Sequence, residues 1–437
     1  MINWDEVEEE ASRMLSVFIK TNTSNPPGNE MDLIRILENI CKNEKLYYKI
    51  YETAPNRGNI IISLDDTFQS SEIFLSHLDV VSAQEEEWEY NPFSGIIKDG
   101  FIHGRGALDT KQLTVMQIMV MILIKRHNLL NENIIMIATS DEERGSNFGF
   151  KKFLEENKTL FKDSYIISEG GGFPIRINGK TVYLIESGQK GHGHIKIWFE
   201  KEKLDNPYYK RNSNLKKCTK LIERIAGLNW KTEIPKNTLE LINNLFELCE
   251  VENKNIFDID EKIELIKKNG NSFIGNMLNS MINNTFTITI WKAGKDLDIE
   301  NETYFEIDVR TLPDVNQDMV AEKIEELIKD TDAKYEIITF NKGFKSSTDN
   351  KLFDIFEEEI KKIDSKNLLL PFVSSGGSDG RFLENYSSTV YGFSPTVEED
   401  SFDKIIPLVH GCNERISKES LVFGIKILLN SFIKLKK

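Results

Sequence analysis

One long apolar segment between two short runs rich in β-branched residues limits what this chain can fold into. TKQLTVMQIMVMILIKRHNLL, residues 110–130, follows EIFLSHLDVV (72–81) and precedes NIIMIATS (133–140). Its length and apolar character predict a helix buried against a sheet. Similar runs of strand character are NIIISL at 59–64, YIISEGGG at 165–172 and TVYLIESG at 181–188. This order predicts an α/β fold with a mixed, mostly parallel sheet flanked by helices.

A second kind of pattern begins at about His194. The 437 residues are too many for one ordinary domain, and 40% of them are hydrophobic. HIKIWFE, FTITIW, YFEIDV and YEIITF, with a helix from Asp318 to Lys329, predict an antiparallel sheet with helices on one face. We therefore expect a first domain, residues 1–193 and 343–437, interrupted by an inserted α+β domain, residues 194–342.

Composition argues against two classes of partner. The net charge of −15 and the pI near 5.1 disfavour nucleic acid and anionic membranes, since both require clustered Lys and Arg. The N-terminal MINWDEVEEE lacks the pattern of a secretory signal, and VMQIMVMILI is too short to span a bilayer. We expect a cytoplasmic protein that acts on a small molecule. Four scattered cysteines fit reduced thiols: Cys41, Cys218, Cys249 and Cys412.

Polar residues follow the predicted strands, where open α/β sheets place their ligand sites. His77 and Asp79 lie two positions apart, so Asp79 is expected to hold the imidazole by its second nitrogen. Two imidazoles and several carboxylates suit a pair of divalent ions such as zinc. The remaining candidates are Asp109 in GRGALDT, Glu142 and Glu143 in DEERG, Glu169 in SEGGG and His410 in LVHGCNER.

Each feature has a simpler interpretation by itself. A single histidine is more often a surface or satisfied core residue than a ligand, and an acidic triplet such as DEE usually lies in a loop or at a helix N-terminus. The glycines of SEGGG can simply form a turn. The metal hypothesis depends on the combination, because five such features occur at strand ends in a chain with six histidines.

Seven motifs in order carry a family resemblance: SHLDVV, GRGALDTK, DEERG, SEGGG, RTLPD, GGSDGRF and HGCNER. They resemble the metallopeptidase family of acetylornithine deacetylase, succinyl-diaminopimelate desuccinylase, aminoacylase and carboxypeptidase G. The resemblance implies a catalytic domain with two zinc ions, or Co²⁺ or Mn²⁺, interrupted by a lid domain. By this resemblance, His77 and Glu169 would bind one ion, Glu143 and His410 the other, and Asp109 would bridge both.

The same resemblance implies roles for the remaining acids. Asp79 would orient a ligand, and Glu142 would be the general base that takes a proton from water and delivers it to the departing amine. Neighbouring residues at a strand end point in different directions, so Glu143 can bind metal while Glu142 faces the water. Asp141 has no such role and is expected to be a loop acid or a helix cap.

The family acts mostly on N-acyl amino acids or on peptides cut beside a free carboxylate. The resemblance implies that Arg310 of RTLP binds this carboxylate together with the loop of Gly376, Gly377 and Ser378. An arginine can grip a carboxylate through two parallel hydrogen bonds, and glycines let backbone N–H groups approach closely. The alternative for Arg310 is a surface ion pair.

The chain departs from the family pattern in the lid. The family has a Gly-His-Ser/Ala motif there, whose histidine stabilises the oxyanion and often reaches a second subunit, so a homodimer through the lid is a further expectation. No histidine occurs between His194 and His410, and Asp298 stands where an asparagine is usual. His192 and His194 are interpreted as strand residues near the hinge. The candidate replacements for the histidine are Lys203, Tyr208, Tyr209 and Arg211.

Three hypotheses follow. The preferred one is a two-metal amidohydrolase, an aminoacylase or deacylase rather than a dipeptidase or carboxypeptidase. The second is a catalytically degraded relative that binds a carboxylate ligand. The third is a hydrolase centred on Cys412, two residues from His410. We interpret Cys412 as a packing residue, because a reactive cysteine needs a base and His410 is assigned to metal.

Overall fold

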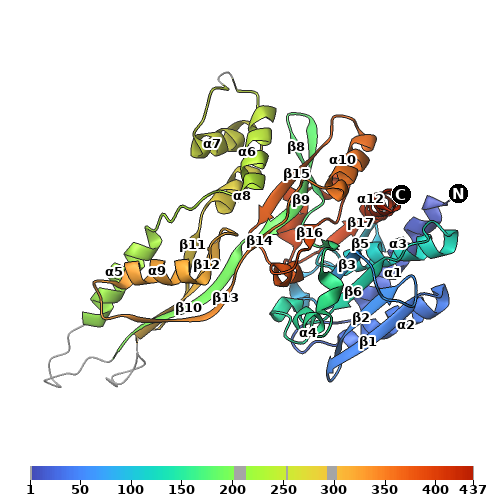
Figure 1. The fold of residues 1–437 in the computed structure, drawn as a ribbon, viewed down its shortest axis with the longest axis horizontal. Coiled ribbons are helices and arrows are strands. Elements are labelled where there is room, and N and C mark those ends of the chain that lie inside the picture. Colours follow the sequence, from blue (N-terminus) through green and yellow to red (C-terminus); the bar gives the residue numbers. More distant parts are fainter. Residues whose placement is uncertain (1, 201–212, 252–253, 293–302, 437) are drawn as a thin grey trace.

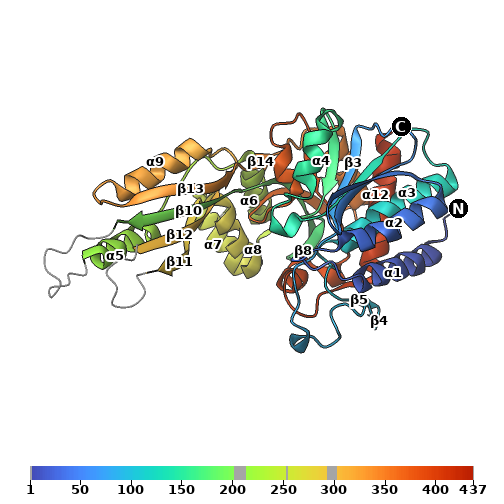
Figure 2. The same ribbon diagram turned by 90° about the horizontal axis from the view of Figure 1, so that it is seen from below.

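The computed structural model describes residues 2–200, 213–251, 254–292 and 303–436. A large α/β body carries both termini, and a smaller, elongated part extends away from it (Figures 1 and 2). In the part of the chain that is described, no helix has both the length and the apolar character needed to cross a membrane.

Ten strands form the sheet of the large body, in the order β1-β2-β6-β3-β7-β16-β9-β14, with β15 and β8 also paired to β9. The central strands β6, β3, β7 and β16 are parallel. The predicted α/β class with a mostly parallel central sheet is therefore confirmed. The strands are β1 (Tyr47–Ala54), β2 (Arg57–Ser63), β3 (Glu72–His77), β6 (Ile135–Thr139), β7 (Tyr165–Ser168), β8 (Phe173–Ile177), β9 (Lys180–Gln189), β14 (Phe344–Lys345), β15 (Leu368–Ser374) and β16 (Thr389–Gly392).

Both faces of the central strands are buried, which explains why their sequences are apolar at consecutive positions. In β3, Phe74 belongs to the main core, whereas Ile73 and Leu75 belong to a second core with residues of α4 (Phe150–Glu156). Helix α3 (Lys111–His127), the predicted buried helix, is buried as far as Ile124. The main core also takes residues from α1 (Trp4–Lys20), α2 (Glu30–Glu44), α3, α10 (Lys351–Ile363), α11 (Phe402–Ile405) and α12 (Lys418–Leu435).

A small three-stranded sheet joins distant parts of the chain. It consists of β17 (Arg415–Ser417), β5 (Phe101–His103) and β4 (Ile97–Lys98), in that order. The antiparallel pairing of β17 with β5 sets the loop that carries His410 beside the segment that leads to Asp109.

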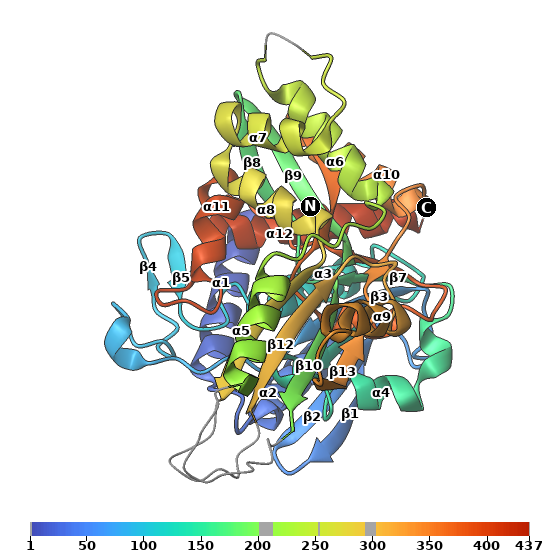
Figure 3. The same cartoon turned by 90° about the vertical axis from the view of Figure 1, so that its left-hand side faces the viewer.

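Four other strands form a separate antiparallel sheet, in the order β11-β12-β10-β13, which we call the lid sheet. In β10, Ile195 and Ile197 are buried with residues of α5 (Ser213–Ala226) and α9 (Gln317–Ile328), while His192 and His194 are half-buried on the other face. Figure 3 shows both helices over this sheet. The strands are β10 (Gly191–Phe199), β11 (Thr285–Lys292), β12 (Thr303–Thr311) and β13 (Lys334–Asn341).

Three helices of the expected inserted segment pack with the large body. They are α6 (Lys236–Leu248), α7 (Ile259–Asn269) and α8 (Ser272–Ile282), and their apolar residues, such as Leu241 and Ile266, join the main core. In Figure 1, α6 lies between α7 and the strands β8 and β15. Residues 194–342 thus contribute to two cores, and the domain boundaries stay a proposal.

Candidate metal centre

The candidate ligands come together at one edge of the central sheet. His77 ends β3, Glu169 directly follows β7, and Glu143 lies four residues beyond β6. These three strands are parallel, so their carboxyl ends meet at the same edge. Asp109 comes two residues before α3, and His410 comes from the loop before β17.

Asp109 stands between two histidines. In the first group of side chains, His77 Nε2 lies 3.0 Å from Asp109 Oδ1 and 3.3 Å from Glu169 Oε2. In the second group, His410 Nε2 lies 3.0 Å from Asp109 Oδ2 and 3.2 Å from Glu143 Oε2. The potential ligand atoms within each group lie within 4.8 Å of one another. The two carboxylate oxygens of Asp109 therefore face different imidazoles, as a bridging ligand requires.

The chemistry of these five residues fits divalent cations. Two imidazole nitrogens and several carboxylate oxygens are the donors that zinc and related ions prefer. Burial raises the pKa of Glu169 to about 7 and also raises that of Glu143, because removal from water disfavours the charged form, and the nearby Asp109 carboxylate adds to both shifts. Hydrogen bonds with Asp109 and Glu143 raise the pKa of His410 to about 10. Glu143 Oε1 is buried and has no hydrogen-bond partner among the described residues.

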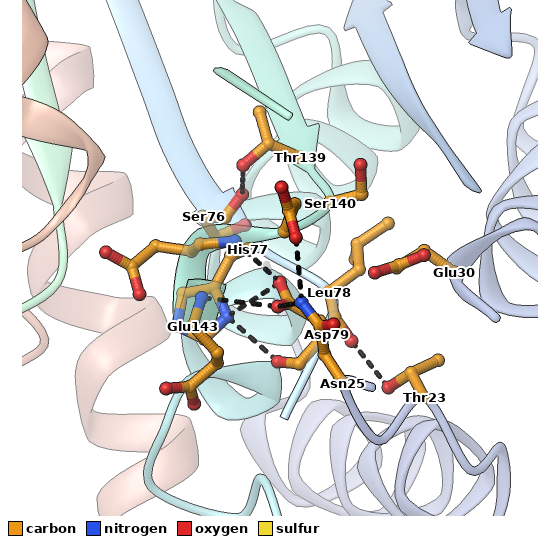
Figure 4. Close-up of polar contacts among 12 residues, drawn as sticks. Thr23, Asn25, Glu30, Ser76, His77, Leu78, Asp79, Thr139, Ser140 and Glu143 are labelled. Atoms are coloured by element: carbon orange, nitrogen blue, oxygen red, sulfur yellow. Dashed lines mark hydrogen bonds and ion pairs between the residues drawn. The ribbon is translucent and has the colours of Figure 1, made fainter. Parts of the chain in front are cut away.

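Asp79 supports the site differently from the expectation. The Nδ1 atom of His77 lies 2.9 Å from the backbone carbonyl of Asp79 but 3.7 Å from its carboxylate (Figure 4). The carboxylate instead accepts hydrogen bonds from the backbone N–H groups of Glu142 and Glu143, at 3.0 and 3.2 Å, and from Asn25 at 2.8 Å. Asp79 thus fixes the DEE turn with its side chain, and the imidazole with its main chain.

Asp141 is a buried ion-pair partner behind the site. Its carboxylate lies 3.0 Å from Arg57 Nη1 and accepts a 3.0 Å hydrogen bond from Asn25. Arg57 also pairs with the buried Glu30 at 2.6 Å. The backbone of Asp141 is left-handed, with φ at +66°. The residue has no place in either ligand group, as expected, but it is part of a buried network rather than a solvated loop.

Glu142 is held by a residue that the sequence analysis did not single out. Arg381 donates a 2.9 Å hydrogen bond to Glu142 Oε1, and both side chains are mostly buried. Arg381 belongs to η4 (Asp379–Leu383), within the motif GGSDGRF. The preceding Asp379 is buried and accepts hydrogen bonds from Thr139 and Ser146. The motif GGSDGRF marks this segment in the sequence, but the contact between its arginine and Glu142 is visible only in the folded structure.

The expected carboxylate-binding residues lie at the junction of the lid sheet and the large body. Arg310, on β12, donates a 3.0 Å hydrogen bond to Asp308 and a 3.3 Å hydrogen bond to the carbonyl of Ser375. Gly376 and Gly377 are exposed on the same loop. Ser378 is buried, and its hydroxyl accepts a 2.6 Å hydrogen bond from Gln189, so this side chain supports the loop instead of facing solvent.

The two histidines of the lid sheet, His192 and His194, have acidic partners on the neighbouring strand β12. His192 Nε2 lies 2.8 Å from Asp308, and His194 Nε2 lies 2.8 Å from Glu306. Cys412 is an exposed free thiol, and its neighbour His410 already contacts two carboxylates. Several residues weighed for the lid lie outside the described part of the chain: Lys203, Tyr208, Tyr209, Arg211 and Asp298.

Both the sequence and the fold resemble those of known proteins. Residues 73–434 match the sequence profile described as Peptidase family M20/M25/M40. The N-fatty-acyl-amino acid synthase/hydrolase PM20D1 of Xenopus tropicalis is 26% identical over 381 residues, which cover 82% of this chain and 72% of that protein. Aminoacylase-1 of Dictyostelium discoideum is 22% identical, with coverage of 97% and 96%. The fold resembles that of an M20 family metallo-carboxypeptidase, Sso-CP2 from Sulfolobus solfataricus, with a TM-score of 0.72, 18% identity and coverage of 98% and 99%.

Proposed function

The chain belongs to peptidase family M20/M25/M40, and we propose that this metallohydrolase cleaves the amide bond of N-acyl amino acids or short peptides with a free carboxylate. The family supplies the reaction class, hydrolysis of amide or peptide bonds. The substrate, the two-metal arrangement and the roles of single residues are our proposal. The observation that carries it is Asp109, whose two oxygens each lie 3.0 Å from a different histidine.

Five residues would hold two divalent ions. His77 and Glu169 would bind one ion, Glu143 and His410 the other, and Asp109 would contribute one oxygen to each. We propose Zn²⁺, with Co²⁺ or Mn²⁺ as substitutes of similar ligand preference. When bound, such ions supply a water of lowered pKa and polarise the scissile carbonyl.

Glu142 is the proposed general base. It lies on the same turn as Glu143 but belongs to neither group of ligand atoms. Arg381 occupies Oε1 and leaves Oε2 to take the proton from water and to pass it to the departing amine. Burial raises the pKa of Glu142 well above its ordinary value, and a carboxyl group of raised pKa can act in both steps near neutral pH.

The free carboxylate is assigned to Arg310 and the backbone of Gly376 and Gly377. Arg310 uses Nε and one N–H of Nη2 for Asp308, and one N–H of Nη1 for the carbonyl of Ser375. Nη1 and Nη2 therefore each keep a further N–H for a ligand. Two relatives, an N-fatty-acyl-amino acid synthase/hydrolase and an aminoacylase, favour an acyl amino acid over a dipeptide as the substrate. A homodimer through the lid sheet and a cytoplasmic location complete the proposal.

A substrate panel tests this proposal. The purified protein is assayed against N-acetyl and N-fatty-acyl amino acids, dipeptides and peptides with a free carboxyl terminus, before and after metal removal by a chelator. The proposal predicts chelator-sensitive cleavage of acyl amino acids that Zn²⁺ restores. Faster cleavage of dipeptides would favour the dipeptidase alternative. Metal binding without cleavage of any substrate would favour a carboxylate-binding relative that has lost turnover.

A further inference from the structure

Glu414 is a fully buried carboxylate that no step of the proposed reaction uses. It lies four residues after His410, in the motif HGCNER. Its two oxygens point into the GRGALD loop, which ends at Asp109. The two loops therefore meet at one side chain, and each carries a candidate metal ligand.

The GRGALD loop surrounds this carboxylate with donors. Glu414 Oε2 accepts hydrogen bonds from Arg105 Nη1 at 2.7 Å and from the backbone N–H of Gly106 at 3.0 Å. Glu414 Oε1 accepts hydrogen bonds from the backbone N–H groups of Leu108 at 2.6 Å and Asp109 at 3.1 Å. One of these donors is the backbone of the proposed bridging ligand itself.

Two further hydrogen bonds join the loops, and the GRGALD loop is again the donor in both. Arg105 Nη2 donates a 2.9 Å hydrogen bond to the carbonyl of Gly411, the residue directly after His410. The backbone N–H of Gly104 donates a 2.9 Å hydrogen bond to the carbonyl of Glu414. Arg105 and Glu414 are both buried, so their charges compensate each other away from solvent. The side chain of His410 is by contrast 53% exposed, and the only side-chain contacts of its Nε2 that we find in the described structure are with Asp109 and Glu143.

We propose that Glu414 is a positioning residue that sets the distance between Asp109 and His410, and so the geometry of the Asp109–Glu143–His410 site. This inference rests on the proposed two-metal function, but it concerns metal affinity and can be tested without any substrate. Asp109 and His410 lie on loops without a shared helix or strand, and Glu414 contacts the backbone of the first from the loop of the second. Partners of this kind around metal ligands typically account for about tenfold to a hundredfold in metal affinity or activity.

Two substitutions of Glu414 distinguish a positioning role from a role in charge balance. Glu414→Gln removes the charge and presents an amide N–H₂ to a group of donors. Glu414→Asp keeps the charge, but its side chain is one methylene shorter and cannot reach both Arg105 and the backbone of Asp109. A positioning role predicts that both variants bind the ion at the Asp109–Glu143–His410 site less tightly. A role in charge balance alone predicts that Glu414→Asp binds both ions like the wild type. The control is Glu359→Gln, because Glu359 is also buried and ion-paired, with Lys362 and Lys434, on α10.

The experiment is a calorimetric titration of the metal-free, full-length protein with Zn²⁺. The wild type and Glu359→Gln should bind two ions. Glu414→Gln and Glu414→Asp should bind one of the two ions, the one that we assign to the Asp109–Glu143–His410 site, about tenfold to a hundredfold less tightly, with a smaller change at the other. Unchanged affinities in a folded Glu414→Gln or Glu414→Asp variant would overturn the proposal, as would failure of both variants to fold, which would assign Glu414 to loop folding alone. A wild type that binds no ion would instead overturn the proposed function.

Discussion

Arg381 donates a 2.9 Å hydrogen bond to the carboxylate of Glu142, although 239 residues separate the two in the sequence. Glu142 lies on the turn after β6, and Arg381 lies on η4 beyond the loop that carries Gly376 and Gly377. The segment assigned to substrate binding therefore also holds the proposed base. Arg381 in turn lies with its guanidinium carbon 4.7 Å from the centre of the Phe382 ring.

Loss of this contact should slow turnover. A hydrogen bond to a charged group is typically worth about 1.5–3 kcal/mol, so Arg381→Ala should lower kcat by about tenfold to a hundredfold. Arg381→Lys should lose less, because it keeps the charge but not the planar geometry. Steady-state kinetics measure the effect, with Arg176→Ala, at an exposed ion pair, as the control. An unchanged kcat in Arg381→Ala would remove Arg381 from the mechanism.

Asp109 should be required for the binding of both ions, and His77 mainly for the binding of one. Asp109→Ala removes an oxygen from each ligand group, so it should abolish stable binding of both ions. His77→Ala leaves the Asp109–Glu143–His410 group intact and should retain about one ion per chain. Elemental analysis of the dialysed variants gives the ion content. Two ions in Asp109→Ala would show that this residue is no bridge.

Arg310 should affect substrate binding more than the chemical step. Arg310→Ala should raise KM for an N-acyl amino acid with little change in kcat, because the guanidinium is proposed to bind a part of the substrate that does not react. The corresponding methyl ester lacks the negative charge and should be cleaved with similar kinetics by the wild type and the variant. Equal losses with acid and ester would mean that Arg310 supports the loop through Ser375 and not the carboxylate.

Asp308 should contribute stability that acid removes. Burial opposes ionisation, but His192 and Arg310 lower the pKa of Asp308 from 3.8 to about 2. A carboxyl group with a lower pKa in the folded state stabilises that state above its unfolded pKa, and this contribution is lost as the pH falls through the folded pKa. Asp308→Asn should therefore reduce the free energy of unfolding by about 1 kcal/mol near neutral pH, after allowance for solvent screening.

Urea unfolding at several pH values tests this linkage. The difference between the wild type and Asp308→Asn should shrink as the pH falls from about 4 to about 2. Asp314→Asn, at an exposed ion pair, is the control and should show little difference. A difference that stays constant over this range would contradict the assignment.

The strands and the positions of the candidate ligands could be predicted from the sequence because both depend on local patterns. His77 and Glu169 follow apolar runs that become parallel strands, and parallel strands end at a common edge. The long apolar run could be predicted as a buried helix from its length and apolar character. In the structure it is buried because helices cover both faces of the sheet. These features need only hydrophobic periodicity and the rules of sheet architecture.

Other features depend on contacts that no local pattern specifies. The use of the Asp79 carbonyl instead of its carboxylate follows from the path of the turn after β3. The contacts of Arg381 with Glu142 and of Glu414 with Asp109 join segments more than 200 residues apart. The association of α6, α7 and α8 with the main core depends on tertiary packing of helices whose amphipathic faces would suit either body.

The most direct test of the proposed mechanism compares Glu142→Gln with the wild type for ion content and turnover in the same preparations. Because Glu142 belongs to neither ligand group, the variant should keep two ions per chain. Its turnover of the best acyl amino acid should fall by about a hundredfold to ten-thousandfold, the usual contribution of a general base. Ordinary turnover in a Glu142→Gln variant that retains both ions would contradict the mechanism.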